Sequence, residues 1–118
     1  MKQKWEVQYH HKFAEEYFQL DETVQNEISI MVELLKEFGP LLRRPKSDTL
    51  EGSNYSNMKE LRFNAKGGVW RVAFAFDPKR QAILLVAGDK KGANQKLFYK
   101  QLIKKADTRF EEWLAALY

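Results

Sequence analysis

The sequence predicts an α+β domain in which helices pack on an antiparallel sheet. Apolar residues recur at helical spacing in residues 12–38 and again after residue 94. Between them, residues 58–87 form short alternating or apolar runs divided by turn residues, which is typical of consecutive strands. A chain of 118 residues, 44% of them hydrophobic, can bury one core of this kind and is too short for two ordinary domains. We therefore expect a single domain, residues 1–118.

The N-terminal part predicts a strand followed by two helices. Residues 4–9 alternate between apolar and polar side chains, as a short edge strand with one buried face does. Asp21 is the expected N-cap between the two helices, and Gly39 followed by Pro40 ends the second one. Helices joined this closely form an αα-hairpin. Its apolar positions are Phe13, Tyr17 and Leu20 in the first helix and Val24, Ile28, Met31, Leu35 and Phe38 in the second.

Residues 41–57 predict a loop, and three strands and a helix follow it. The loop is rich in Pro, Gly, Ser and Asn. The expected strands are residues 58–64, 69–76 and 82–87, joined into an antiparallel meander by turns at residues 66–68 and 77–80. From Asn94 a last helix carries an apolar stripe, which consists of Tyr99, Ile103, Ala106, Phe110, Trp113 and Leu117. The predicted order is strand, αα-hairpin, three-strand meander and C-terminal helix.

Basic residues are concentrated in the second part of the chain. Residues 1–40 hold four Lys and no Arg against eight carboxylates, whereas residues 41–118 hold sixteen Lys and Arg against eight carboxylates. This uneven distribution gives one part of the surface a positive field. Such a field favours a polyanion such as RNA over a neutral partner.

The strongest candidates for an anion-binding site lie in and after the predicted strands. Arg62 and Arg71 belong to neighbouring strands and can share one face of the sheet. Ala73 and Ala75 follow Arg71 on its face, so we expect its guanidinium to stand over a shallow, uncrowded surface; the alternative is an exposed arginine in a surface ion pair. The other candidates are Lys59, Lys90 and Lys91, the aromatic pair Phe98 and Tyr99, and the helix lysines Lys96 and Lys100.

Several of these candidates also have a purely structural interpretation. Lys59 is three residues from Arg62 and falls on the opposite face of an ideal strand, where it would be a solvated lysine. Lys90 and Lys91 lie between two glycines, in a kind of loop that is common on protein surfaces and lacks the spacing of a P-loop or a dinucleotide fingerprint. Tyr99 begins the apolar stripe of the last helix and can equally belong to the core.

Other kinds of site are not indicated by the sequence. The chain has no Cys, which fits a reducing compartment, and its His, Asp and Glu residues show no spacing typical of a metal site. His10 and His11 are expected to be surface or capping residues. No stretch approaches the roughly 20 apolar residues of a membrane span. We therefore expect a soluble, cytoplasmic protein with no membrane partner.

Three segments and the pair Phe98-Tyr99 carry a family resemblance. The segments are MKELRF (residues 58–63), VWRVAFAFD (residues 69–77) and LLVAGDKKG (residues 84–92). With them, and with the order of its elements, the whole chain resembles the RelE/ParE superfamily of toxin-antitoxin toxins. Within this superfamily it is most similar to the HigB-like, phage-derived branch.

The resemblance implies a RelE-like fold and a small toxin that enters the ribosomal A site and cleaves messenger RNA without a metal or other cofactor. It also implies a cognate antitoxin, usually with a helix-turn-helix DNA-binding part. By position, Arg62 and Arg71 look like the family's strand arginines, Lys90 or Lys91 like its basic residue after the last strand, and Tyr99 like its aromatic residue near the C-terminal helix. No general base is assigned, because these groups vary among the family's active toxins.

These residue types suit cleavage in which the RNA 2′-hydroxyl attacks the adjacent phosphate. Arg62 and Arg71 would neutralise the phosphorane oxygens, and Lys90 or Lys91 together with Tyr99 would transfer protons. Phe98 or Tyr99 could also stack on a base. Two alternatives use the same fold: a ParE-like gyrase inhibitor that cuts no nucleic acid, and a non-catalytic module that binds RNA or a partner. The clustered basic residues favour the ribonuclease, because a gyrase inhibitor would not need them.

Overall fold

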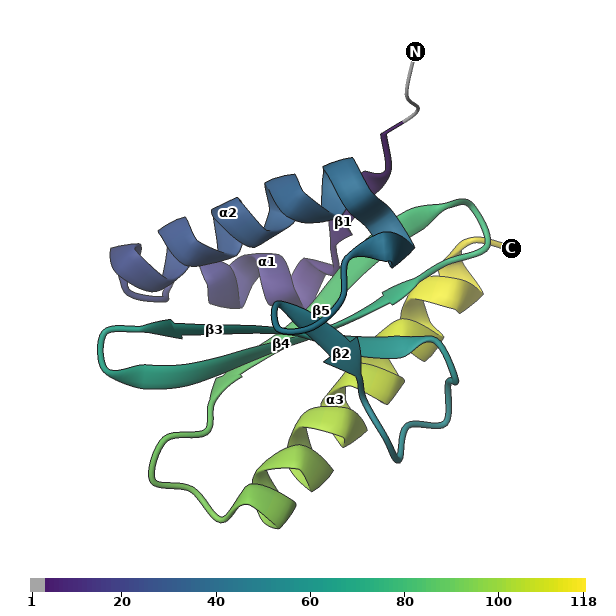
Figure 1. Ribbon diagram of the computed structural model, residues 1–118. Coiled ribbons are helices and arrows are strands. Elements are labelled where there is room, and N and C mark those ends of the chain that lie inside the picture. The colour runs from purple at the N-terminus through teal and green to yellow at the C-terminus, as the bar shows by residue number, and fades with distance from the viewer. Residues whose placement is uncertain (1–3) are drawn as a thin grey trace.

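The computed structural model describes residues 4–118 and has the predicted α+β architecture (Figure 1). Its elements in chain order are β1 (Glu6–Tyr9), α1 (His11–Tyr17), α2 (Glu22–Phe38), the short 3-10 helix η1 (Gly39–Leu41), β2 (Ser47–Thr49), β3 (Met58–Ala65), β4 (Gly68–Phe76), β5 (Gln81–Asp89) and α3 (Gln95–Ala116). The predicted fold class and the predicted αα-hairpin, meander and C-terminal helix are confirmed.

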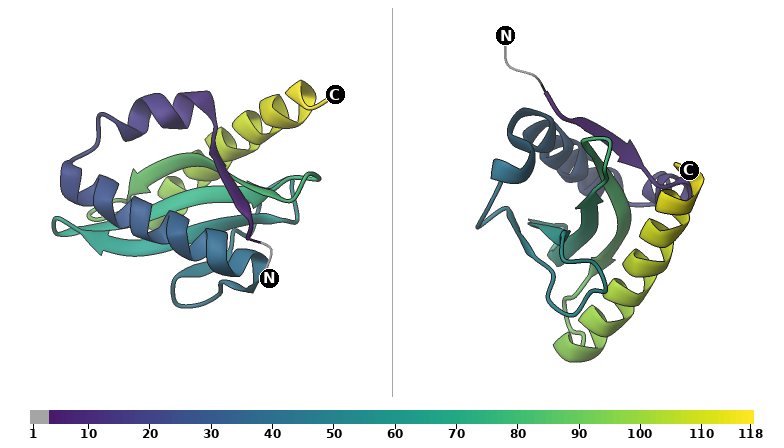
Figure 2. Two further views of the ribbon diagram at one scale, coloured as in Figure 1. Left: turned by 90° about the horizontal axis from the view of Figure 1, so that it is seen from above. Right: turned by 90° about the vertical axis from the view of Figure 1, so that its right-hand side faces the viewer.

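The sheet has five strands in the order β1-β5-β4-β3-β2. β1 lies at one edge, as predicted, and pairs in parallel with β5, whereas the other neighbours are antiparallel. Helices α1 and α2 cover one face of the sheet and α3 covers the other (Figure 2). Two buried clusters result, one on each face, and the strands between them are the most deeply buried part of the molecule.

The helix boundaries follow from side-chain caps. The Asp21 carboxylate accepts a hydrogen bond from the backbone N–H of Thr23 at 2.8 Å, so the predicted N-cap of α2 is confirmed. Asn94 caps α3 in the same way by accepting from the N–H of Leu97 at 3.0 Å. At the other end of α2, Gly39 has a positive φ of 51°, a conformation that glycine adopts at little cost.

His10 caps α1 but is not a surface residue. Its Nδ1 accepts a hydrogen bond from the N–H of Lys12 at 3.1 Å, as expected of a cap. Of the two alternatives, surface or capping, the capping one is confirmed: the side chain is only 1% exposed, and its Nε2 lies 3.0 Å from Glu112 of α3. His10 therefore ties the start of α1 to the C-terminal helix.

The predicted loop at residues 41–57 contains a strand that the sequence pattern did not reveal. β2 pairs antiparallel with β3, Ser47 opposite Leu61 and Thr49 opposite Lys59. Its three residues, Ser-Asp-Thr, are polar and show no apolar alternation. Backbone pairing to the outer edge of β3 holds this strand in the sheet. The sheet is therefore one strand wider than predicted.

Candidate functional site

A tight hairpin between β3 and β4 places two arginines opposite each other. Lys66 and Gly67 form a two-residue turn with φ values of 52° and 73°, a backbone conformation that matches the twist of a hairpin. The register that follows from this turn pairs Arg62 with Arg71. Side chains that are directly opposite point to the same face of the sheet, and here that face is the one covered by α3. The expectation that both arginines share one surface is confirmed.

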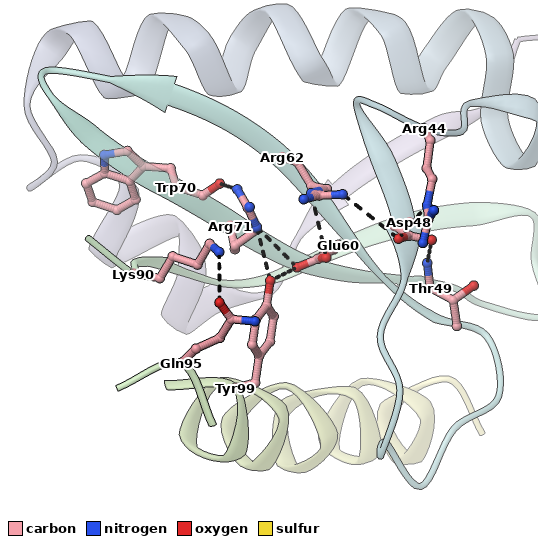
Figure 3. Close-up of polar contacts among 10 residues, drawn as sticks. All are labelled: Arg44, Asp48, Thr49, Glu60, Arg62, Trp70, Arg71, Lys90, Gln95 and Tyr99. Carbon is pink, nitrogen blue, oxygen red and sulfur yellow. Dashed lines mark hydrogen bonds and ion pairs between the residues drawn. The ribbon is translucent and has the colours of Figure 1, made fainter. Parts of the chain in front are cut away.

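Glu60 joins these arginines from the same strand. It lies two residues before Arg62, so both side chains point to the same face of β3. The Tyr99 hydroxyl, which comes from α3, donates a hydrogen bond to Glu60 Oε1 at 2.9 Å and accepts one from Arg71 Nε at 3.1 Å. Arg71 Nε is also 3.6 Å from Glu60 Oε1. Figure 3 shows the four side chains converging between the sheet and α3. We call Glu60, Arg62, Arg71 and Tyr99 the arginine cluster.

Arg71 is buried, which corrects the expectation of an uncrowded surface around it. Its side chain is only 6% exposed, and Nη1 donates to the carbonyl of Trp70 at 2.9 Å. Ala73 and Ala75 are small, but the space above them is filled by α3, and both residues are fully buried. The alternative of a solvent-exposed ion pair is wrong for the same reason. A guanidinium held by a carboxylate, a hydroxyl and a carbonyl is fixed in position before any ligand arrives.

Arg62 is the accessible member of the arginine cluster. Its side chain is 35% exposed, and it lies 4.0 Å from both Glu60 and Asp48. Asp48 is held in turn by Arg44, whose Nε donates to it at 2.9 Å. A pocket of about 270 Å³ opens beside Arg62 and reaches Arg71, with Pro45 on its rim. Arg62 and Arg71 both line this pocket.

The environment raises the pKa of both acidic groups in the arginine cluster. Burial raises the pKa of Glu60 above its usual value, and the Tyr99 hydrogen bond and the two arginines oppose this only in part. Burial and the hydrogen bond to Glu60 raise the pKa of Tyr99 as well. Near neutral pH, Tyr99 is therefore a proton donor, and Glu60 is a stronger proton acceptor than an ordinary carboxylate.

The two loop lysines lie on different sides of the β5–α3 connection. Lys90 is half-buried, and its Nζ donates to Gln95 Oε1 at 3.4 Å, beside the arginine cluster (Figure 3). Lys91 is exposed and extends toward the β3–β4 turn, where its Nζ would lie 3.4 Å from a Cβ added at Gly67. The structure thus brings Lys90 close to the predicted site and directs Lys91 away from it.

The predicted RNA-contacting residues are distributed over three places. Lys59 lies on the face of β3 that α1 and α2 cover. Side chains alternate between the two faces of a strand, and Lys59 is three residues from Arg62, which is on the α3 face. Phe98 is half-buried and packs on Gly88 of β5, where an added Cβ would meet its ring at 2.9 Å. Lys96 and Lys100 are exposed on the first turns of α3, and Lys96 precedes Tyr99 by three residues and shares its side of the helix.

Sequence reasoning missed Glu60 and Asp48. A signal for Glu60 was present, because the strand predicted over residues 58–64 puts it on the face of Arg62. Asp48 lies in β2, which carries no pattern of its own, so only its pairing opposite Glu60 reveals its place. Together these carboxylates make the site an alternation of acids and bases and not a purely basic patch.

Two further properties concern the whole described chain. Within residues 4–118, no group of three or more His, Cys, Asp or Glu side chains is arranged to hold a metal ion. Over the same residues, no helix combines the length and the apolar character needed to cross a membrane.

Comparison with known proteins gives the family. A family model described as "Phage derived protein Gp49-like (DUF891)" matches residues 15–111. The chain belongs to this Gp49-like family. It is 45% identical over 100 residues to a protein of Mycobacterium tuberculosis (strain ATCC 25618 / H37Rv) named "Putative toxin HigB3", a match that covers 85% of each chain. It is also 45% identical over 97 residues to "Putative toxin HigB2" of the same organism, covering 81% of this chain and 48% of that protein.

Solved structures of RelE share the fold of this Gp49-like protein. A mutant of Escherichia coli toxin RelE in the free state matches with a TM-score of 0.65 at 11% identity, covering 90% of this chain and 97% of that one. The archaeal RelE–RelB complex from Pyrococcus horikoshii OT3 contains a chain that matches with a TM-score of 0.54 at 20% identity, covering 75% of this chain and 98% of that one. The predicted resemblance to HigB-like toxins of the RelE/ParE superfamily is confirmed.

Proposed function

We propose that this Gp49-like protein is the toxin of a type II toxin-antitoxin system and that it inhibits translation by cleaving messenger RNA in the ribosomal A site. The HigB relatives support the first part of the proposal. The arginine cluster supports the second, and its Arg62–Arg71 pair beside a buried carboxylate is the observation that carries it. Because ribosomes are the site of action in this proposal, the protein would act in the cytoplasm.

In the proposed reaction, Arg62 and Arg71 hold the phosphodiester in the pocket beside them. Two guanidinium groups suit this role, since they remain charged and donate several hydrogen bonds to phosphate oxygens. As the 2′-oxygen attacks, negative charge grows on the non-bridging oxygens, and the fixed arginines stabilise it without having to reorganise. The ion pair with Glu60 keeps Arg71 in place for this step.

Proton transfer is the role we propose for Glu60 and Tyr99. Glu60 takes the proton from the 2′-hydroxyl as its oxygen bonds to phosphorus. Tyr99, or Lys90 beside the arginine cluster, gives a proton to the 5′-oxygen as the phosphorus–oxygen bond to it breaks. The products are a 2′,3′-cyclic phosphate and a free 5′-hydroxyl. The raised pKa of Glu60 and the protonated state of Tyr99 near neutral pH fit these two roles.

A cognate antitoxin completes the proposal. One of the structures with this fold is a RelE chain in complex with RelB. By analogy, this protein would be held inactive by a partner that covers its basic surface, usually one that carries a helix-turn-helix DNA-binding part. Masking the positive charge and the pocket at Arg62 would block the entry of RNA.

The experiment that tests the proposal is primer extension on a defined messenger RNA, with and without translating ribosomes. Wild-type protein is compared with Glu60→Gln and Arg71→Lys, because both variants keep a side chain of similar size in a buried position. Thermal unfolding of each variant checks that it folds. We expect cuts at in-frame codons only with ribosomes, with both variants reducing cleavage by roughly 10²- to 10⁴-fold.

Each other outcome redirects the proposal. Cuts without ribosomes would keep the nuclease and discard the A-site mechanism. The absence of cuts by folded wild-type protein would overturn the nuclease, and inhibition of DNA gyrase would then be measured next. Full activity in folded Arg71→Lys would remove the arginine cluster from the mechanism.

A further inference from the structure

One edge of β5 has no strand partner along part of its length. β1 pairs with β5 only as far as Tyr9, which lies opposite Leu84. The chain then turns away into α1, and the strand order places no other described strand on that side. Residues 85–89 of β5 therefore form an open edge, defined here as the side of these residues that faces away from β4.

Backbone groups of this open edge point outward. Lys90 N donates to the carbonyl of Val69 on β4 at 2.8 Å, which marks that pair as hydrogen-bonded. Hydrogen-bonded pairs alternate with non-bonded pairs in an antiparallel ladder, so Ala87 and Asp89 direct their N–H and C=O groups away from β4. The exposure rises along the strand, from buried Leu85 to exposed Asp89. These groups are free to pair with another extended chain.

A groove of about 660 Å³ runs along the same edge between α1 and α3. Its floor is apolar, formed by residues 86–88 of β5 and by Phe98 and Leu102 of α3. Phe98 and Tyr99 diverge at this point, since Phe98 lines the groove whereas Tyr99 reaches into the arginine cluster. The groove is therefore a separate surface from the arginine cluster and its pocket.

The rim of the groove is basic. Lys12, Lys104, Lys105 and Arg109 line it, and no carboxylate does. Arg109 is neutralised by Glu16 at 2.7 Å, and Lys12 lies 3.6 Å from Glu112. Lys104 and Lys105 are exposed, and neither forms an ion pair within residues 4–118. An acidic ligand would gain from these two lysines and displace no existing ion pair.

We propose that the open edge of β5 and the basic groove beside it bind an extended, acidic segment of a partner protein by strand addition. The unpaired backbone would supply hydrogen bonds, the apolar floor would take alternate side chains, and the two lysines would select for carboxylates. The outward backbone groups favour a peptide over RNA, because RNA has no matching ladder of donors and acceptors. This inference does not require that the protein cleave RNA.

The test uses an acetylated peptide of about ten residues that alternates Glu and Val, long enough to cover the open edge. Its affinity is measured by fluorescence anisotropy, with a Lys-Val peptide as the matched control. Hydrogen exchange of the labelled protein then reports on individual amides. We expect binding of the acidic peptide alone, with slower exchange at Ala87 and Asp89.

Charge reversal distinguishes binding of the peptide in the groove from a general electrostatic attraction between an acidic peptide and a basic protein. Lys104→Glu/Lys105→Glu is expected to weaken peptide binding about tenfold or more, a loss of about 1.4 kcal/mol. The control variant Lys36→Glu/Lys79→Glu makes the same change of net charge, but on α2 and in the β4–β5 turn. We expect it to change the affinity for the acidic peptide less than about twofold. Equal losses in the two variants would overturn the proposal.

Three other results would overturn it as well. The acidic peptide could fail to bind, or it could bind without slowing exchange at Ala87 and Asp89. A short oligouridine could instead protect these amides where the peptide does not, which would assign the groove to RNA. All of these readouts are independent of cleavage, so a failure here is distinguishable from a failure of the proposed ribonuclease.

Discussion

At the scale of single residues, Glu60 is a carboxylate whose ionisation the fold opposes. It is 6% exposed, and burial raises its pKa above the usual 4.5 in spite of two neighbouring arginines. A group whose pKa is raised by folding favours the folded state below its unfolded pKa, and this contribution is lost as pH rises through the folded pKa. Ionised Glu60 therefore lowers the stability of the protein near neutral pH.

We expect Glu60→Gln to be stabilised relative to wild type as pH rises. Gln cannot ionise but can still accept the Tyr99 hydrogen bond, so the difference in free energy of unfolding should grow from pH 4.5 up to the folded pKa of Glu60 and then level off. Urea denaturation at a series of pH values measures it. Glu16→Gln is the control of opposite sign, since the hydrogen bond from Arg109 lowers the pKa of Glu16 and its carboxylate stabilises the fold above pH 4.5. A flat profile for Glu60→Gln would contradict the raised pKa.

Tyr99 is the second residue of the arginine cluster for which one functional group, the hydroxyl, is expected to affect both stability and RNA cleavage. Its hydroxyl is the only atom that bonds to both Glu60 and Arg71 among the hydrogen bonds of the described chain. Tyr99→Phe keeps the ring and removes this bridge, so we expect a loss of about 1–3 kcal/mol in stability because two buried groups lose a partner. If Tyr99 also donates the proton in RNA cleavage, activity in the primer-extension assay falls by roughly 10²- to 10⁴-fold.

A matched substitution separates the two effects of Tyr99. Tyr17 also uses its hydroxyl, which donates to the carbonyl of Gln25 at 3.2 Å, but it lies on α1, on the opposite face of the sheet from the arginine cluster. Tyr17→Phe is expected to lower stability slightly and to leave cleavage unchanged. Equal loss of cleavage in both variants, measured at a temperature where both are folded, would show that Tyr99 acts only through stability.

At the scale of elements, Arg109 fastens α3 to the rest of the molecule. The side chain is 7% exposed and donates two hydrogen bonds to Glu16 of α1, at 2.8 and 2.7 Å. Nη1 also donates to the carbonyl of Leu85 at 2.8 Å. The register of β5 against β4 shifts at this carbonyl, where a β-bulge leaves a backbone group that the sheet does not satisfy. One arginine thus connects the C-terminal helix, α1 and the irregular point of β5.

We expect Arg109→Met to destabilise the protein by about 1–3 kcal/mol, because methionine fills the space but leaves the buried carbonyl of Leu85 without a donor. Hydrogen exchange should increase most in α3 and at the bulge of β5. Glu16→Gln serves as the comparison, since it removes only a partly exposed carboxylate and should cost less. An equal loss in the two variants would show that the ion pair, and not the backbone contact, carries the effect.

Elements with local signals were predictable, whereas elements set by distant contacts were not. The caps at Asp21 and Asn94 and the turn at Gly67 are local, and with the turn comes the pairing of Arg62 with Arg71. β2 has no such signal, because backbone pairing alone holds it. The bulge in β5 is hidden within a run of apolar residues that fits either face of the sheet.

The candidate site was predictable only in part for a related reason. Its arginines could be placed on one surface from the strand pattern, but the helix that covers Arg71 begins 24 residues later in the chain. Small side chains at Ala73 and Ala75 indicate space next to a strand and do not say whether solvent or a helix fills it. Glu60 was missed because its role depends on Tyr99, which is 39 residues away.

At the scale of the whole molecule, the uneven charge along the chain becomes an uneven charge in space. All eight carboxylates of the acidic N-terminal part lie within residues 4–40, which include β1, α1 and α2, and the two helices cover one face of the sheet. The basic residues 41–118 form strands β2 to β5, the β5–α3 loop and α3, which covers the other face of the sheet (Figure 2). A molecule with this asymmetry turns its α3 side toward a polyanion.

This asymmetry predicts how salt and charge reversal change RNA binding. Lys96→Glu/Lys100→Glu on α3 should weaken binding of a single-stranded RNA at low salt and lower the slope of log K against log salt concentration by about 0.7 for each phosphate that is no longer neutralised. Lys36→Glu on α2 should change neither quantity, because that lysine lies on the acidic side and is paired with Glu33 at 3.0 Å. Filter binding at several salt concentrations measures both. If Lys36→Glu weakened binding as much per charge as the α3 variant, net charge and not its placement would control the encounter with RNA.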